Sequence, residues 1–233
     1  MDSIIFQANV IGMLMYIIPA MLLFFYIING LEDRLVERKL YLASGIGVVL
    51  GTIAEIIMFV SGTDLYTDVA YASMILVTPF IIMMFMFIGV NLKTFKDEPA
   101  APYYSAGYGL FFGGAIEFWK LLITEDRYSN MSVGDFLLIT LFGLGTVVFL
   151  GGAGMWIAYA IRNDNGIRIT GRLAFVYLFL QYLYASVLEH VHYGLHDFAL
   201  IIVSIIAFFV VSGALFHQGY LRLPKIAKTV NVE

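Results

Sequence analysis

Three glutamates lie inside long apolar stretches of this sequence, where charged side chains are rare. They are Glu55, Glu117 and Glu189, and they follow one another at intervals of 62 and 72 residues (117 − 55 and 189 − 117). A carboxylate at the centre of a membrane helix costs about 2.5–3.5 kcal/mol on insertion scales, so such residues usually have a function or a partner. A bound cation or a proton would account for all three. The structural alternative is that each glutamate is protonated and hydrogen-bonds to a neighbouring helix.

The third glutamate opens the segment EHVHYGLHD (189–197), which adds imidazole groups to the carboxylates. Glu189, His192 and His196 recur at i, i+3 and i+7 and therefore share one helical face. Glu-x-x-His is the spacing with which di-iron carboxylate bundles direct two ligands at one metal. Together with Glu55 and Glu117, it predicts a site for zinc, iron or manganese, because calcium prefers oxygen ligands alone.

A symmetrical two-metal centre is not expected, because the positions that match His192 in the other two helices are Lys120 and Met58. Lys120 lies one turn beyond Glu117, so it is either an ion-pair partner that neutralises this glutamate without metal or a functional group. His196 is a candidate fifth ligand of the metal. Lys120, Asp197, Gln7 and Asn9 are candidates for orienting the ligands. For His196, Asp197, Gln7 and Asn9, a solvated turn or helix start is the simpler account.

The glutamates belong to an internal repeat. GIGVVLGTIAE (45–55) and GYGLFFGGAIE (107–117) share the pattern G-x-G-x-x-x-G-x-x-x-E, and FLQYLYASVLE (179–189) is a degenerate third copy. Residues four apart lie on one helical face, and small residues let membrane helices approach closely. The repeat therefore predicts that each glutamate points into the bundle, along a packed stripe formed by Gly47, Gly51, Gly109, Gly113 and Ala185.

Seven apolar stretches are long enough to cross a bilayer, which takes about 20 residues per helix. They run roughly from 4 to 30, 41 to 62, 68 to 92, 101 to 124, 133 to 161, 172 to 195 and 198 to 221. The predicted fold is an all-α integral membrane protein with seven transmembrane helices in a single domain, 1–233. It comprises three helical-hairpin repeats (1–62, 63–124 and 125–195), a closing helix (196–221) and a tail (222–233).

Eleven of the thirteen Lys and Arg residues gather in alternate loops and in the tail. By the positive-inside rule, the N-terminus is then outside the cell membrane and the tail is cytoplasmic. The three glutamates fall in the outer half of the bilayer. Acidic residues cluster at the outer helix ends, where they would concentrate cations.

Composition excludes several classes of protein. The chain is 61% hydrophobic and 13% charged, whereas a soluble domain is about 45–50% apolar. Its lack of cysteine rules out disulfides, thiol catalysis and iron–sulfur clusters. A retinal Schiff base of the rhodopsin type would need a lysine in the last helix, and residues 198–221 contain none. No basic block suggests nucleic acid as a partner.

Three functions fit these features. The first is a membrane metalloenzyme with its metal site in the extracytoplasmic half. The second is a proton or cation transporter or channel that uses the same carboxylates. The third is an accessory subunit of a multi-subunit membrane complex, in which the glycine stripes serve assembly. All three take the lipid bilayer as the first partner and a multi-pass location in the cell membrane.

Overall fold

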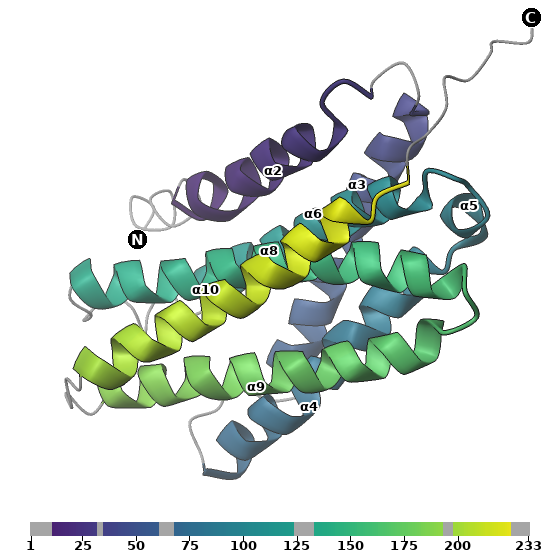
Figure 1. Cartoon of the computed structure of the whole chain (residues 1–233). Coiled ribbons are helices and arrows are strands. Elements are labelled where there is room, and N and C mark those ends of the chain that lie inside the picture. The colour runs from purple at the N-terminus through teal and green to yellow at the C-terminus, as the bar shows by residue number, and fades with distance from the viewer. Residues whose placement is uncertain (1–10, 32–34, 61–67, 124–132, 193–197, 225–233) are drawn as a thin grey trace, which may run out of the picture.

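Every regular element in the described part of the chain is a helix, as predicted. The computed structural model describes residues 11–31, 35–60, 68–123, 133–192 and 198–224. The elements are η1 (Met13–Ile17) running into α2 (Ile18–Ile28), α3 (Glu37–Val60), α4 (Asp68–Val90), α5 (Lys93–Lys96), α6 (Ala101–Ile123), α8 (Val133–Ile161), α9 (Gly166–His192) and α10 (Phe198–Leu221). Their arrangement is shown in Figure 1.

Each predicted apolar stretch contains one long helix, counting η1 and α2 together. Among the described residues, three helical segments are long and apolar enough to cross a membrane: Glu37–Val60, Phe136–Ile161 and Ala199–Leu221. Met13–Ile28 and Leu76–Val90 are apolar but shorter. Two further long helices, α6 and α9, are not among these segments, and α5 has only four residues.

Two helices begin before their apolar stretch. α9 starts at Gly166 instead of 172, and α3 starts at Glu37 instead of 41. In the first turn of α9, the Thr170 hydroxyl donates a hydrogen bond of 2.8 Å to the Gly166 carbonyl. Apolar composition marks the part of a helix that can lie in lipid, whereas the helix itself continues through polar residues that satisfy its backbone.

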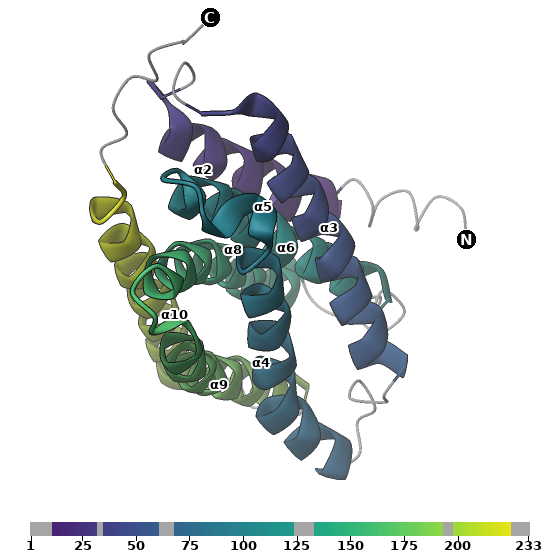
Figure 2. The same ribbon diagram turned by 90° about the vertical axis from the view of Figure 1, so that its right-hand side faces the viewer.

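The helix α6 lies at the centre of the bundle, between α3 on one side and α8 on the other (Figure 2). Almost every residue from 101 to 117 is buried. A Cβ added at Gly47 of α3 would lie 2.5 Å from the Tyr108 carbonyl oxygen, and one added at Gly51 would lie 2.5 Å from that of Phe112. The glycine stripe of α3 is therefore in backbone contact with α6.

Glycines on the other faces of α6 let its remaining neighbours approach. A Cβ at Gly109 would collide with the Leu150 carbonyl oxygen of α8, and one at Gly113 would lie 3.1 Å from Val147 Cα. A glycine also lies at the contact between α8 and α10, since a Cβ at Gly152 of α8 would lie 2.9 Å from the backbone nitrogen of Phe216 in α10. Glycines thus allow close packing of α3 on α6, of α6 on α8 and of α8 on α10.

Packing in the bundle crosses the boundaries of the sequence repeat. α2 and α3, which the sequence pairs as the first hairpin, pack on α6 more than on each other. α4 packs mainly on α9, although two long helices, α6 and α8, lie between them in the chain. The helices of one sequence unit therefore find their main partners in other units.

Cationic residues from alternate loops gather at one end of the bundle, which we call the cationic end. Lys39 at the start of α3 forms an ion pair with Glu98, just before α6. Arg162 at the end of α8 donates a hydrogen bond of 3.3 Å to the Pro99 carbonyl. The Tyr103 hydroxyl donates one of 3.0 Å to the carbonyl of Pro224, after α10. These links bring the loops together at the right of Figure 1.

Candidate functional site

Glu55 and Glu117 are both buried in the bundle, each with 3% of its surface exposed. Glu55 lies five residues before the end of α3 (60 − 55), and Glu117 lies six before the end of α6 (123 − 117). Both helices begin at the cationic end, so both glutamates lie toward the opposite end. A rise of about 1.5 Å per residue puts each of them roughly 8–9 Å from its helix terminus.

A lysine interacts with both carboxylates. The Lys120 ammonium lies 3.6 Å from Oε1 of Glu117, one turn away on α6. It also lies 4.4 Å from the ring centroid of Tyr184 on α9, in a cation–π contact. The carboxylate of Glu55 acts on the same ammonium electrostatically. We refer to Glu55, Glu117 and Lys120 as the acid–lysine cluster.

A glycine of α8 makes room for the Glu117 carboxylate. A Cβ at Gly143 would lie 2.9 Å from Glu117 Oε2 and 2.6 Å from Cε1 of Tyr16. Tyr16 is fully buried and belongs to the π-helical turn η1. A π turn inserts an extra residue into a helix and changes the direction of its side chains, and such turns are frequent at functional sites. The first helix thus contributes a phenol beside the buried carboxylate.

Polar side chains extend from the acid–lysine cluster toward the middle of the bundle. Tyr177 of α9 is buried and lies within the electrostatic reach of Glu117 and Lys120. Its hydroxyl is within hydrogen-bonding reach of the side chains of Thr146 on α8 and Gln181 on α9. These three hydroxyl and amide groups continue the polar region away from the glutamates, between α8 and α9.

The acid–lysine cluster contains more carboxylates than ammonium groups. Glu55 and Glu117 supply two carboxylates, and Lys120 supplies one ammonium. An ionised carboxylate is strongly unfavourable when buried, so buried carboxylates favour the binding of a proton or a small cation. The chemistry that the described residues favour is therefore proton or cation binding.

The predicted metal ligands fall into two groups. Glu55 and Glu117 lie as described above, and the backbone of α9 carries Glu189 and His192 in its last turn. The side chains of residues 188–192 lie outside the description, as do His196, Asp197, Gln7 and Asn9. Within the described residues, no group of three His, Cys, Asp or Glu side chains is placed to hold a metal ion. The metal site stays a prediction.

The small residues of the repeat lie at helix contacts. Gly47, Gly51, Gly109 and Gly113 pack against neighbouring helices as given above. Ala185, which replaces the last glycine of the third copy, is buried on α9. The helix α9 packs on α4 and α8, whereas α3 packs on the other side of α6.

Sequence reasoning missed the tyrosines of the site. Fifteen tyrosines occur in the chain, so their abundance conceals the three that surround the cluster: Tyr16, Tyr177 and Tyr184. A signal did exist on α9, because Tyr177, Gln181 and Tyr184 recur at i, i+4 and i+7 and so form one polar stripe on an apolar helix. For Tyr16, no sequence signal distinguishes it from packing.

No known family model, curated protein or solved structure matches the chain.

Proposed function

We propose that the chain is a multi-pass membrane protein that binds and exchanges protons or small cations at the acid–lysine cluster, as a transporter or channel does. The observation that carries the proposal is the partly buried ammonium of Lys120, which lies 3.6 Å from the buried Glu117 carboxylate and within the electrostatic reach of the buried Glu55. Intramembrane ionisable residues that face a bundle interior mark ion and proton pathways by default. Two buried carboxylates beside one ammonium are suited to take up a proton and release it.

Membrane insertion of seven helices in the cell membrane, with the N-terminus outside, is part of the same proposal. It is supported by the three long apolar segments and by large apolar side chains exposed over the outside of the bundle. The gathering of Lys and Arg at one end supports the orientation, since cytoplasmic loops carry an excess of these residues. The cluster would then lie in the outer half of the membrane.

Lys120 favours a proton over a divalent metal at this site. Its ammonium lies 3.6 Å from Glu117 and also acts on Glu55. A divalent ion bound between the two carboxylates would be repelled by this fixed positive charge. A proton, by contrast, leaves the ion pair of Glu117 and Lys120 in place and neutralises the remaining carboxylate.

Proton movement by the reconstituted chain tests the proposal. Proteoliposomes with an imposed potassium diffusion potential and an internal pH dye should show potential-driven pH change with the wild type. The substitution Glu117→Gln or Glu55→Gln should abolish it, because an amide does not ionise near neutral pH and so cannot take up and release a proton as a carboxylate does. Glu98→Gln is the matched control, since Glu98 lies in a partly exposed ion pair at the cationic end. Absence of proton movement, or equal activity in all variants, would refute a proton pathway.

A metal site remains the second candidate, and one observation favours it. α9 carries Glu189 and His192 in its last turn, at the end of the bundle opposite the cationic end, where Glu55 and Glu117 also lie. Elemental analysis of the purified chain should then give a stoichiometric transition metal that His192→Ala removes. Removal of the metal by His192→Ala without loss of proton movement would show two separate properties. If the purified wild type contains no metal, the metal site is refuted and proton binding is the remaining candidate.

A further inference from the structure

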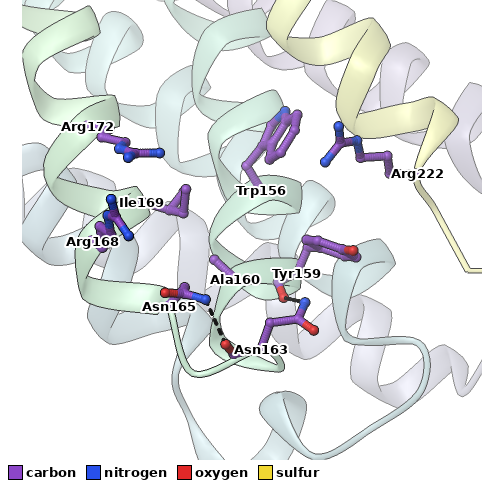
Figure 3. Close-up of a pocket in the computed structure, with 9 residues that line it drawn as sticks. All are labelled: Trp156, Tyr159, Ala160, Asn163, Asn165, Arg168, Ile169, Arg172 and Arg222. Carbon is purple, nitrogen blue, oxygen red and sulfur yellow. Dashed lines mark hydrogen bonds between the residues drawn. The ribbon is translucent and has the colours of Figure 1, made fainter.

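A cationic pocket lies at the end of the bundle opposite the acid–lysine cluster, between the end of α8, the start of α9 and the end of α10. It encloses about 290 Å³ and is lined by Trp156, Tyr159, Ala160, Asn163, Asn165, Arg168, Ile169, Arg172 and Arg222. Figure 3 shows Arg168 and Arg172 on α9 facing Arg222 across the hollow, with the Trp156 ring between them. A second hollow of about 320 Å³ continues past Arg222 to Arg162 and Pro102.

Arginines supply the charged side chains that line the pocket. Among the described residues, neither hollow is lined by Asp or Glu, although Asp164 lies in the adjoining turn. The ion pairs of Lys39 with Glu98 and of Lys120 with Glu117 do not involve an arginine of the pocket. Three exposed arginines that converge on one hollow repel one another, and an anion between them would relieve this repulsion.

Neighbouring groups hold the pocket in shape. The Arg222 guanidinium lies 4.4 Å from the centroid of the Trp156 ring, in a cation–π contact. The indole nitrogen of Trp156 donates a hydrogen bond of 3.1 Å to the Leu215 carbonyl of α10, which fixes the ring. Asn165 donates one of 2.9 Å to the Asn163 carbonyl and so closes the turn between α8 and α9. Arg222 is thus held over a ring that is itself anchored.

We propose that this pocket binds the phosphate group of an anionic phospholipid. Arginine matches phosphate in charge and geometry, because its planar guanidinium donates two parallel hydrogen bonds. Basic pockets between membrane helices on the cytoplasmic side are a recurring form of phospholipid headgroup site. The volume is at the small end of the range for ligand sites, about 300–1,000 Å³, which suits a headgroup.

The surroundings favour a lipid over a free phosphate ion as the source of that group. The pocket lies at the cationic end, where the proposed topology puts the cytoplasmic membrane surface. Its rim carries Trp156 and Tyr159, residue types that concentrate at membrane interfaces. Large apolar side chains are exposed in the same part of α9, including Ile167 at 79% and Phe175 at 64%, and acyl chains can lie along them. The site is separate from the acid–lysine cluster and goes beyond the function proposed for it.

Lipid binding to the full-length chain in detergent tests the inference. Native mass spectrometry should show phosphatidylglycerol retained in preference to phosphatidylcholine, which carries the same phosphate but no net charge. The substitutions Arg168→Gln and Arg172→Gln should each weaken retention about fivefold, in line with the contribution of one cationic side chain at an anionic membrane. Arg38→Gln is the matched control, because Arg38 is exposed at the cationic end but does not line the pocket.

A second arm separates the two sources of phosphate. Inorganic phosphate at millimolar concentration should raise the unfolding temperature less than phosphatidylglycerol does and should not displace the retained lipid. Equal retention of the two lipids, or an equal effect of Arg38→Gln, would overturn the proposal. A different result would assign the pocket to free phosphate and overturn the proposal of a lipid. In that case inorganic phosphate would displace the retained lipid from the wild type, and phosphate would have no effect on Arg168→Gln.

Discussion

A Cβ at Gly143 of α8 would lie 2.9 Å from Oε2 of Glu117 on α6. Real Cβ atoms do not approach an oxygen so closely, so the absence of a side chain at this position is what admits the buried carboxylate. The same Cβ would lie 2.6 Å from Tyr16. One glycine therefore sets the distance between α8, the π turn of the first helix and the acid–lysine cluster.

The substitution Gly143→Ala should disturb the cluster as well as the packing. The added methyl displaces Tyr16 or Glu117, and overpacking of this kind typically costs about 1–3 kcal/mol. We expect a lower unfolding temperature in detergent and slower proton movement in proteoliposomes. Gly213→Ala in α10 is the control, because a Cβ there meets nothing within 4 Å. If Gly143→Ala matched that control in both assays, the close approach to Glu117 would not matter.

Removal of Lys120 alone should lower the stability of the chain more than removal of both partners of its ion pair with Glu117. Lys120→Met leaves Glu117 buried without its cation, and breaking a buried ion pair in this way costs about 3–5 kcal/mol. Combining it with Glu117→Gln removes the unpaired charge, so the double variant should be more stable than Lys120→Met alone. Thermal unfolding of the four forms in detergent measures the coupling between the two residues.

The ion pair at the cationic end gives a matched comparison. In the pair of Lys39 and Glu98 the side chains are 26% and 37% exposed, against 17% and 4% for Lys120 and Glu117. Exposed pairs contribute about 0–1 kcal/mol, so Lys39→Met should have little effect on unfolding. An equal decrease in the free energy of unfolding for Lys39→Met and Lys120→Met would mean that burial does not distinguish the two ion pairs.

The positions of the helices were predictable because apolar composition over about 20 residues identifies a membrane-length segment. The central role of α6 was not predicted, although glycines on several of its faces indicate it. Gly107 faces the Phe24 ring of α2, while Gly109 faces the backbone of α8. The repeat drew attention to one glycine stripe, whereas a helix surrounded by others needs small residues on more than one side.

The candidate site was partly predictable for a similar reason. Glu117 and Lys120 are three residues apart on one helix, so their pairing follows from helical geometry and was one of two alternatives for Lys120. The contact of Glu117 with Gly143 and Tyr16 depends on how three helices pack. Their positions in the sequence are too far apart for local spacing to reveal such contacts, and α2 and α3 do not pair as the hairpin pattern suggests.

The backbone contact between α6 and α8 at Gly109 predicts a clear effect of substitution, because a backbone atom cannot move aside as a side chain can. A Cβ at Gly109 would collide with the Leu150 carbonyl oxygen, which cannot move without shifting α8. We expect Gly109→Ala to destabilise the chain by about 1–3 kcal/mol. Gly45→Ala on α3 meets nothing within 4 Å and should be neutral or stabilising by up to about 1 kcal/mol, because alanine favours helix. Denaturation in mixed micelles measures both, and a neutral Gly109→Ala would contradict the packing of α6 on α8.

The proposed topology can be tested cleanly because the chain has no cysteine of its own. Asp164→Cys lies in the turn between α8 and α9, beside the arginines of the cationic end. In intact cells a membrane-impermeant maleimide should leave it unlabelled until the membrane is opened, because that turn would be cytoplasmic. Ser129→Cys, between α6 and α8 in the sequence, should react at once from outside. Ala106→Cys on α6 is the buried control and should react in neither case. Labelling of Asp164→Cys in intact cells would reverse the orientation and put the acid–lysine cluster in the cytoplasmic half of the membrane.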